Sequence, residues 1–285
     1  MKFAVIVPAH NEEAFLPRLF ESLVRQHRLP DKLILVDDNS SDNTAKLMEE
    51  MAHKHAFVEW VSTASRQQHQ PGAKVVEAFN YGLQFLKTKV EVLIKLDADL
   101  ELPPSYFSKV IACFKTKSVG IAGGYCYEKN KAGKWVLNHP MNRDHVRGAF
   151  KAYRMACFKS MGGLRPAMGW DTVDELLARH NGYEVVALTD LKVRHHRPLG
   201  KRYTPLAARE QGKAFYQMRY GLFWSGAAIV KNGWKKKSVV WMVYCLQGYF
   251  RAKQSQLGYM VNEAEGKFIR SYRRAQLLKR IKKGW

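Results

Sequence analysis

The sequence predicts an α/β fold in which a mainly parallel, doubly wound sheet is flanked by helices. Three observations favour this class. Short apolar runs of strand length recur through residues 1–103. The segments between these runs carry apolar residues at helical spacing. Acidic residues follow two of the runs directly, as is typical of the edge where the parallel strands of an open sheet end. Such an alternation of strand and helix indicates a parallel sheet.

The first half of this domain follows a regular order. We expect strands at residues 3–7, 33–36, 58–62 and 92–96, with helices at residues 15–24, from about 42 to 53, and at 73–86. The segment from Pro8 to Glu13 is expected to form a turn after the first strand. No G-x-G-x-x-G motif follows that strand, and the sequence contains no G-x-x-x-x-G-K-[ST] motif. Dinucleotide binding and P-loop chemistry are therefore disfavoured.

The second half has a less regular pattern. A helix after Ser105 and a strand at residues 118–122 come first, residues 135–147 have the composition of a loop, and residues 148–158 fit either a strand or a helix. Residues 169–175 lead into a short helix at residues 176–180, which Asn181 and Gly182 end. A strand at residues 183–188 follows, and residues 191–198 end the core.

The most informative polar residues are Asp97 and Asp99, which directly follow the apolar run at residues 92–96. Side chains at positions i and i+2 of an extended segment point the same way, so both carboxylates could face one cation. Oxygen ligands in small number suit Mg²⁺ or Mn²⁺ that carries the phosphates of a substrate. The alternative is a solvated turn with two acidic residues.

Charge divides the chain. Of the net +22 of the 285 residues, residues 192–285 carry +19, from 22 Lys/Arg against 3 acidic residues, whereas residues 1–191 carry +3. Such a basic extension points to a polyanion, either nucleic acid or an anionic membrane. The four cysteines have no paired spacing, so we expect free thiols. No apolar segment approaches the roughly 20 residues that span a bilayer. We therefore expect a cytoplasmic protein.

Three ordered motifs within residues 1–200 resemble the family 2 glycosyltransferases, which are inverting enzymes of the GT-A fold that use nucleotide-diphosphate sugars. The motifs are Val7-Pro8-Ala9-His10-Asn11-Glu12-Glu13, Val36-Asp37-Asp38-Asn39-Ser40-Ser41-Asp42 and Asp97-Ala98-Asp99. The segment from Gly72 to Gly82, with Lys74, Ala78 and Asn80, is similar to the donor-binding helix of the family.

The resemblance implies a role for each motif. Backbone groups of Pro8, Ala9 and Asn11 and the carboxylate of Glu12 would hold the nucleoside, Asp38 would accept a hydrogen bond from the base, and Lys74 would contact base or phosphate. A carboxylate that accepts from an imide N–H favours a UDP- or dTDP-sugar. Asp97 would face the sugar or ribose, and Asp99 would bind the metal on the diphosphate.

An inverting transfer also needs a base for the acceptor hydroxyl. The family places it eleven residues before a glycine, which is Asp171 here, counted from Gly182. Asp174 is the alternative, with Asp171 then capping the helix. His195 or His196 is expected to ligate the metal or contact the diphosphate, and Arg197 to pair with phosphate.

We therefore expect a GT-A catalytic domain at residues 1–204, with a nucleotide-sugar half at 1–103 and an acceptor half at 104–204. Residues 205–285 carry aromatic and apolar runs between lysine clusters, and end in a basic helix at residues 265–283. This pattern indicates helices that lie on an anionic membrane, peripheral to the inner face of the cell membrane. A lipid-linked or surface-glycan acceptor would fit such a place.

Two other classes stay open at this level. A basic nucleic-acid-binding protein would explain the charge, but no recognised nucleic-acid module occurs and the charge lies outside the domain with the acidic residues. A nucleotidyltransferase also uses paired aspartates, but it normally has a glycine- and arginine-rich loop after the first strand, which Pro8 to Glu13 does not provide.

Overall fold

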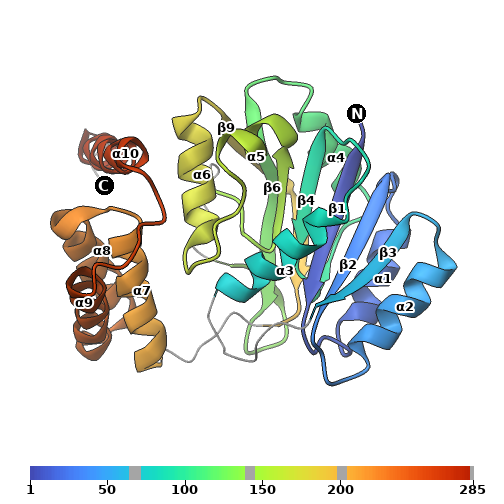
Figure 1. The fold of residues 1–285 in the computed structure, drawn as a ribbon, viewed down its shortest axis with the longest axis horizontal. Helices are drawn as coiled ribbons and strands as arrows, with labels where there is room; N and C mark the ends of the chain where they lie inside the picture. The colour runs from blue at the N-terminus through green and yellow to red at the C-terminus, as the bar shows by residue number, and fades with distance from the viewer. Residues whose placement is uncertain (64–71, 139–144, 198–203, 283–285) are drawn as a thin grey trace.

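The computed structural model describes residues 1–63, 72–138, 145–197 and 204–282 and confirms the predicted α/β class. Within these residues a mixed sheet runs in the order β3-β2-β1-β4-β8-β6-β9-β5, with β7 paired to β6. Figure 1 shows this sheet, with α7 to α10 grouped beside it on the left. The strands are β1 (Phe3–Ala9), β2 (Lys32–Asp38), β3 (Val58–Thr63), β4 (Val92–Leu96), β5 (Leu100–Glu101), β6 (Val119–Lys129), β7 (Trp135–Leu137), β8 (Phe150–Arg154) and β9 (Glu184–His195).

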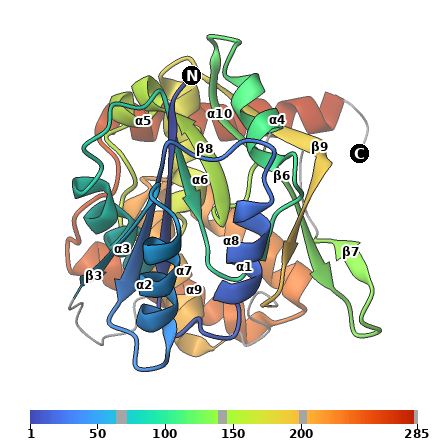
Figure 2. The ribbon, with the colours of Figure 1, turned by 90° about the vertical axis from the view of Figure 1, so that its right-hand side faces the viewer.

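Helices cover both faces of the sheet. They are α1 (Leu16–Val24), α2 (Thr44–Lys54), α3 (Ala73–Gln84), α4 (Tyr106–Cys113), α5 (Met155–Ser160) and α6 (Trp170–His180). Helix α3 lies on the face turned to the viewer in Figure 1, and α1 lies on the opposite face, as the side view in Figure 2 also shows. Strand β1 is buried along its whole length between them, so the core lies there.

The first half has the predicted parallel arrangement. Strand β1 pairs in parallel with β2 and with β4, and β2 pairs in parallel with β3. Pro8 and Ala9, which we expected in a turn, are the last two residues of β1 and pair with Val36 and Asp37. Because β1, β2 and β4 run in one direction, their carboxyl ends lie at one edge of the sheet.

The second half differs from the prediction in four places. Residues 148–158 contain both a strand, β8, and a helix, α5, and β8 runs antiparallel to β4 and β6. A short strand, β7, lies within the expected loop at residues 135–147. Strand β6 continues to Lys129, and the segments at 183–188 and 191–198 form one strand, β9, up to His195. These segments are strands because they pair with residues far away in the sequence, and local composition does not predict such pairing.

Helix α6 also begins earlier than predicted, at Trp170 and not at Leu176. Gly169 precedes it with φ +83°, a left-handed conformation that glycine adopts at no cost. The side chains of Trp170 and Val173 are buried against the domain. This burial stabilises the first helical turn, although the acidic composition of the segment is typical of a loop. Both candidate bases, Asp171 and Asp174, therefore lie on the helix.

Residues 205–282 form four helices, α7 (Pro205–Gln217), α8 (Gly221–Lys236), α9 (Val239–Gln254) and α10 (Glu263–Lys282). Lys283, the end of the expected basic helix, lies outside the described residues. Helices α7 and α9 pack backbone to backbone, because a Cβ on Gly212 would lie 1.8 Å from the carbonyl oxygen of Cys245 and one on Gly248 would lie 2.0 Å from that of Arg209. The helical region contacts the α/β domain through Arg165, which donates to both carboxylate oxygens of Glu265 at 3.0 and 2.9 Å.

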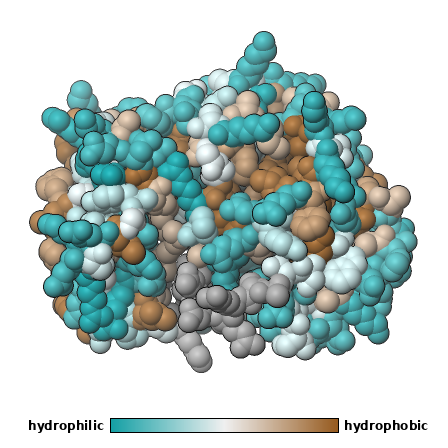
Figure 3. All heavy atoms as spheres, in the orientation of Figure 1, coloured by the Kyte–Doolittle hydropathy of each residue, from teal (hydrophilic) through white to brown (hydrophobic). Residues whose placement is uncertain are grey.

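Helices α8 and α9 expose many large apolar side chains. The exposed ones are Leu222, Phe223, Val230 and Trp234 on α8 and Val239, Val240, Val243, Leu246 and Phe250 on α9. In the space-filling view, apolar side chains lie among hydrophilic ones over this helical region on the left (Figure 3). None of the helices within the described ranges combines the length and the apolar composition that crossing a bilayer requires. The four cysteines are free thiols, as predicted.

Candidate active site

Hydrogen bonds join the turns that follow β1 and β2 at the shared edge. Asn11 has φ +55°, its backbone N–H donates to Oγ of Ser40 at 3.0 Å, and its side-chain oxygen accepts from the Ser41 N–H at 2.8 Å. The Glu12 N–H donates to Oγ1 of Thr44 at 2.7 Å. These bonds fix the main chain of the candidate nucleoside-binding segment against β2.

Asp37 and Asp38, the last residues of β2, differ in their contacts. Asp37 accepts from the Ser40 N–H and from the Ser62 hydroxyl, both at 3.2 Å, so it holds the turn together. Asp38 is buried, yet its Oδ1 has no hydrogen-bond partner within the described residues. A buried acceptor without a partner is costly, so Asp38 Oδ1 is available to a ligand. Lys74 lies in the first turn of α3.

Asp97 and Asp99 have different side-chain partners. The strand ends at Leu96, and the chain turns at residues 97–99, so the alternation of an extended segment does not apply. The carboxylate of Asp97 pairs with the ammonium group of Lys95, whose side chain is 1% exposed. Asp99 is buried and turns instead toward His195 and Arg197. Of the two carboxylates, that of Asp99 is therefore the better placed to bind a metal together with His195.

His195 is the residue nearest to the Asp99 carboxylate. Its Nε2 lies 3.1 Å from Oδ1 of Asp99, and its Nδ1 lies 3.5 Å from Oε1 of Glu128 on β6. Burial opposes a charged imidazole, but Asp99 and the neighbouring Cys126 outweigh it and raise the pKa of His195 to about 10. Burial likewise opposes ionisation of Asp99, but His195 and Arg197 outweigh it and lower the pKa of Asp99. Each group thus stabilises the charged form of the other, and a cation bound to Nε2 of His195 would take the place of the proton there.

His196 and Arg197 turn elsewhere. The ring nitrogens of His196 lie 3.0 Å from Glu101 and 3.1 Å from Arg18, so this histidine faces away from Asp99. Arg197 lies 2.5 Å from the Glu12 carboxylate and 3.8 Å from that of Asp99. Burial raises the pKa of Glu12 to about 7; Arg197 opposes the rise, and Asp99 adds to it.

The residues around Asp99 fit a divalent cation. Oδ1 of Asp99, Nδ1 of His195 and Oε1 of Glu128 are all buried, and none has a well-formed hydrogen bond within the described residues. Carboxylate oxygen and imidazole nitrogen are ligands that Mn²⁺ and Mg²⁺ accept. Cys126, Glu128 and His195 form a second possible cluster, with ligand atoms within 4.8 Å of one another. Buried polar atoms without a hydrogen-bond partner among the described residues therefore lie on both sides of the His195 ring.

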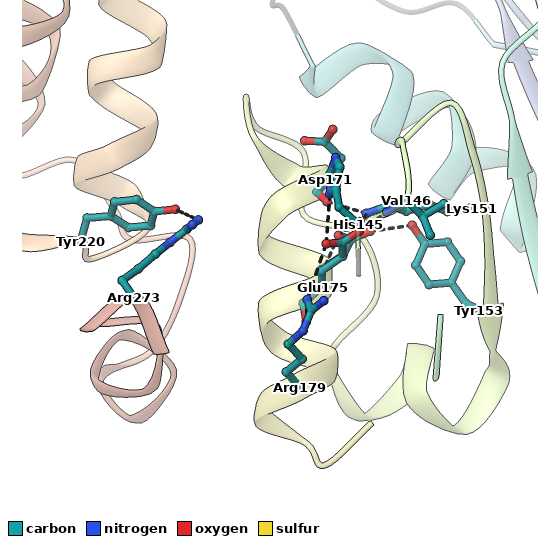
Figure 4. Close-up of polar contacts among 10 residues, drawn as sticks. His145, Val146, Lys151, Tyr153, Asp171, Glu175, Arg179, Tyr220 and Arg273 are labelled. Carbon is teal, nitrogen blue, oxygen red and sulfur yellow. Dashed lines mark hydrogen bonds and ion pairs between the residues drawn. The ribbon is translucent and has the colours of Figure 1, made fainter. Parts of the chain in front are cut away.

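The two candidate bases on α6 have different environments; Figure 4 labels Asp171 and also Lys151 and Tyr153, which donate to Asp174. Asp174 is 3% exposed, and its oxygens accept from Lys151 at 2.8 and 3.0 Å and from the Tyr153 hydroxyl at 2.7 Å. The carboxylate of Asp171 has no hydrogen-bond or ion-pair partner among the residues described, and in Figure 4 it points away from this cluster. The backbone oxygen of Asp171, by contrast, accepts from the ammonium group of Lys151.

Glu175 completes the buried cluster. It lies 3.1 Å from the Lys151 ammonium group, accepts from the Val146 N–H at 2.8 Å and contacts His145 at 3.1 Å. Burial would raise its pKa, but Lys151 and His145 outweigh burial and lower the pKa of Glu175 to about 2. Lys151 and His145 therefore favour the ionised form of Glu175.

Burial also raises the pKa of Asp174, to about 7, against the pull of Lys151. A pKa near 7 is what a general base needs. The geometry weighs more, however, because both oxygens of Asp174 are engaged and a substrate hydroxyl cannot reach a carboxyl that is almost fully enclosed. The structure thus favours Asp171 as the group that meets an acceptor.

Two buried lysines belong to this region and were absent from our prediction. Lys95 on β4 and Lys151 on β8 are register partners across the antiparallel pair, and both lie against the ring of Trp170, at 5.1 and 6.0 Å from its centroid. One signal was available for Lys95, because it interrupts an apolar strand and lysine is almost never fully buried without a partner. Glu128 gave no signal, since only the register of β6 and β9 brings it to His195.

The strand order of the sheet, with carboxylates and basic side chains gathered where its parallel strands end, agrees with the GT-A fold that the motifs led us to expect. Residues 4–167 match the model of Glycosyl transferase family 2, and the chain belongs to that family. This assignment replaces the nucleotidyltransferase and nucleic-acid-binding alternatives as the activity of the chain.

Two curated relatives illustrate the match. The undecaprenyl-phosphate 4-deoxy-4-formamido-L-arabinose transferase of Proteus mirabilis is 33% identical over 116 residues, which cover 39% of this chain and 33% of that protein. The dolichol-phosphate mannosyltransferase of Pyrococcus furiosus is 30% identical over 174 residues, which cover 60% of this chain and 45% of that protein. The match thus spans between a third and a half of the length of these relatives.

Solved structures share the fold at low identity. S. aureus TarS 1–349 in complex with UDP-GlcNAc aligns with a TM-score of 0.55 and 21% identity over 74% of this chain and 66% of that one. The mannosyltransferase PcManGT from Pyrobaculum calidifontis, in complex with GDP-Man and Mn²⁺, aligns with a TM-score of 0.57 and 14% identity over 97% of this chain and 80% of that one.

Proposed function

We propose that this glycosyltransferase moves a sugar, with inversion, from a UDP- or dTDP-sugar to a hydroxyl of a lipid-linked or surface-glycan acceptor. The observation that carries this proposal is the cluster of Glu12, Asp99, His195 and Arg197 at the carboxyl ends of the parallel strands, with orphaned buried acceptors beside it. Such a cluster suits a ribose, a divalent cation and a diphosphate next to one another.

The donor side uses the edge of the sheet. Main-chain groups of Pro8, Ala9 and Asn11 and the carboxylate of Glu12 hold the nucleoside, and the unpaired Oδ1 of Asp38 accepts from the base. Lys74 contacts base or phosphate. Asp97, held by Lys95, accepts hydrogen bonds from hydroxyl groups of the sugar or ribose.

The diphosphate lies beside Asp99. Asp99 and His195 would hold Mg²⁺ or Mn²⁺, and Arg197 would leave Glu12 or Asp99 to pair with phosphate oxygens. The cation would neutralise charge that develops on the departing diphosphate. His196, the other candidate ligand, is less suited because Glu101 and Arg18 engage its ring.

The acceptor side uses α6. Asp171 takes the proton of the acceptor hydroxyl while the oxygen of that hydroxyl bonds to the anomeric carbon, and the bond from this carbon to the diphosphate oxygen breaks on the opposite face. Asp174 and Lys151 hold the first turn of the helix that carries Asp171. The names of the relatives, an undecaprenyl-phosphate transferase and a dolichol-phosphate mannosyltransferase, support an acceptor hydroxyl that is carried on a lipid phosphate.

We also infer that the helical region rests on an anionic membrane, peripheral to the inner face of the cell membrane. Helices α8 and α9 contain no acidic residue, carry lysines and arginines, and expose apolar side chains. An apolar face with a basic rim binds the interface of anionic lipids.

A panel of nucleotide sugars, each with Mn²⁺ or Mg²⁺, tests the proposed reaction. We expect a UDP- or dTDP-sugar to raise the melting temperature and to be slowly hydrolysed, only with the metal. Asp99→Ala should abolish both effects, and Asp190→Ala, which removes a surface carboxylate paired with Lys109, should leave them unchanged. If no UDP-, dTDP- or GDP-sugar binds with metal, the proposal is wrong.

A further inference from the structure

His195 lies between two carboxylates that come from different strands. Its Nε2 faces Oδ1 of Asp99 at 3.1 Å, and its Nδ1 faces Oε1 of Glu128 at 3.5 Å. Glu128 on β6 is the register partner of His195 on β9, so the pairing of these two strands sets their approach. The His195 side chain is 5% exposed and that of Glu128 is 16% exposed, which leaves the ring little freedom to turn.

The backbone supports the same geometry. His195 pairs with Leu100 on β5, and the N–H of His196 donates to the carbonyl oxygen of Asp99 at 2.9 Å. The main chain on both sides of the ring is therefore fixed relative to Asp99. What remains to be set is which ring nitrogen carries the proton.

That choice decides whether His195 can bind a cation beside Asp99. A neutral imidazole has one N–H and one lone pair, and only the lone pair coordinates a metal. A carboxylate that accepts from Nδ1–H leaves the lone pair on Nε2, on the side of Asp99. Ligating histidines commonly donate their other N–H to a carboxylate in this way, which fixes the tautomer and makes the ligand more basic.

We propose that Glu128 is a positioning residue that holds a proton on Nδ1 of His195 and thereby presents Nε2, together with Asp99, to the divalent cation of the donor complex. This inference rests on the proposed function. It gives a role to a carboxylate that no motif predicts, and it pairs two buried atoms, Oε1 of Glu128 and Nδ1 of His195, that lack a hydrogen-bond partner among the described residues. The competing arrangement places the cation on the other side of the ring, among Cys126, Glu128 and Nδ1 of His195.

Binding of Mn²⁺ in the presence of UDP, followed by electron paramagnetic resonance, tests the inference without turnover. We expect Glu128→Gln to weaken Mn²⁺ affinity about 10- to 100-fold, the range for loss of a partner of a ligating histidine. Glu184→Gln, at the opposite end of β9, is the matched control and should bind like the wild type. Melting temperatures of the metal-free variants report any structural damage separately.

A double-mutant cycle separates positioning from simple charge. If Glu128 acts through the ring, Glu128→Gln should have no further effect on Mn²⁺ affinity in a His195→Ala background. Nitrogen-15 spectra of the Mg²⁺ and UDP complex should show His195 with its proton on Nδ1. Cys126→Ala should leave Mn²⁺ affinity unchanged.

Several results would overturn the inference. The first is a Mn²⁺ affinity of Glu128→Gln equal to that of the control, and the second is an undiminished effect of Glu128→Gln in the His195→Ala background. The third is a His195 proton on Nε2 in the complex. The fourth is loss of Mn²⁺ binding in Cys126→Ala, which would place the cation on the far side of the ring. A wild type that binds no Mn²⁺ with UDP would instead refute the metal in the proposed function, and with it this inference.

Discussion

Replacement of each candidate base by asparagine distinguishes a residue needed for transfer from a residue needed for the stability of the fold. Asp171→Asn changes a carboxylate for which the described residues show no hydrogen bond or ion pair, so the free energy of unfolding should stay within about 0.5 kcal/mol of the wild type. Donor binding should also persist, because Asp171 lies on the acceptor side. Transfer should fall by a factor of roughly 10² to 10⁴, the usual contribution of a general base.

Asp174→Asn should have the opposite signature. Both oxygens of Asp174 lie within 3.0 Å of the Lys151 ammonium group, so either orientation of the amide turns an NH₂ group toward a buried cation. Leaving that donor without an acceptor costs about 1–3 kcal/mol. For a domain of this size, a cost of about 2 kcal/mol lowers the melting temperature by roughly 4–8 °C.

Three measurements on the same preparations decide the matter: urea unfolding, donor-dependent thermal stabilisation, and transfer rate on a scale normalised to folded protein. Asp190→Asn, on the surface, controls for the loss of one negative charge. If Asp174→Asn unfolds like the wild type and abolishes transfer, while Asp171→Asn retains it, Asp174 is the base and the geometric argument is wrong.

Two further predictions concern the pH dependence of stability and the binding of anionic vesicles. Against the effect of burial, Lys151 and His145 lower the pKa of Glu175 from 4.5 to about 2. The ion pairs of Glu175 therefore stabilise the fold fully above pH 4.5, and this stabilisation is lost as the pH falls from 4.5 toward 2. In urea unfolding, the advantage of the wild type over Glu175→Gln should therefore shrink by about 3 kcal/mol across this window, and an advantage independent of pH would contradict the prediction. Trp234, 81% exposed on α8, should insert into the interface of anionic vesicles. In co-sedimentation, Trp234→Glu should weaken vesicle binding roughly tenfold, equivalent to about 1.4 kcal/mol, whereas Val136→Glu on β7 should not; equal binding by both variants would exclude this face.

The parts of the fold that sequence predicted are those set by local pattern. Strands β1, β2 and β4 are continuous apolar runs, and the helices between them carry apolar stripes, so each element can be recognised from its own sequence. Strand β8 does not, because Phe150–Arg154 contains a lysine and an arginine and owes its conformation to β4 and β6 on its two sides.

The candidate site divides in the same way. Asp38 ends β2 and Asp99 comes shortly after β4, so both could be located in advance. The separation of Asp97 from Asp99 depends on the buried ammonium group of Lys95, which a one-dimensional pattern does not place. The contrast between Asp171 and Asp174 likewise depends on Lys151, a residue on another strand.

The position of β8 has a consequence for biosynthesis. When the ribosome has released residues 1–103, β1 to β4 can already pair, but the second edge of β4 stays bare until β8 emerges some fifty residues later. A bare edge of buried apolar residues is a template for pairing between nascent chains. Expression of the first half alone should therefore yield inclusion bodies, and pulse-proteolysis of stalled chains should show protection of β4 only after Arg154 has left the exit tunnel.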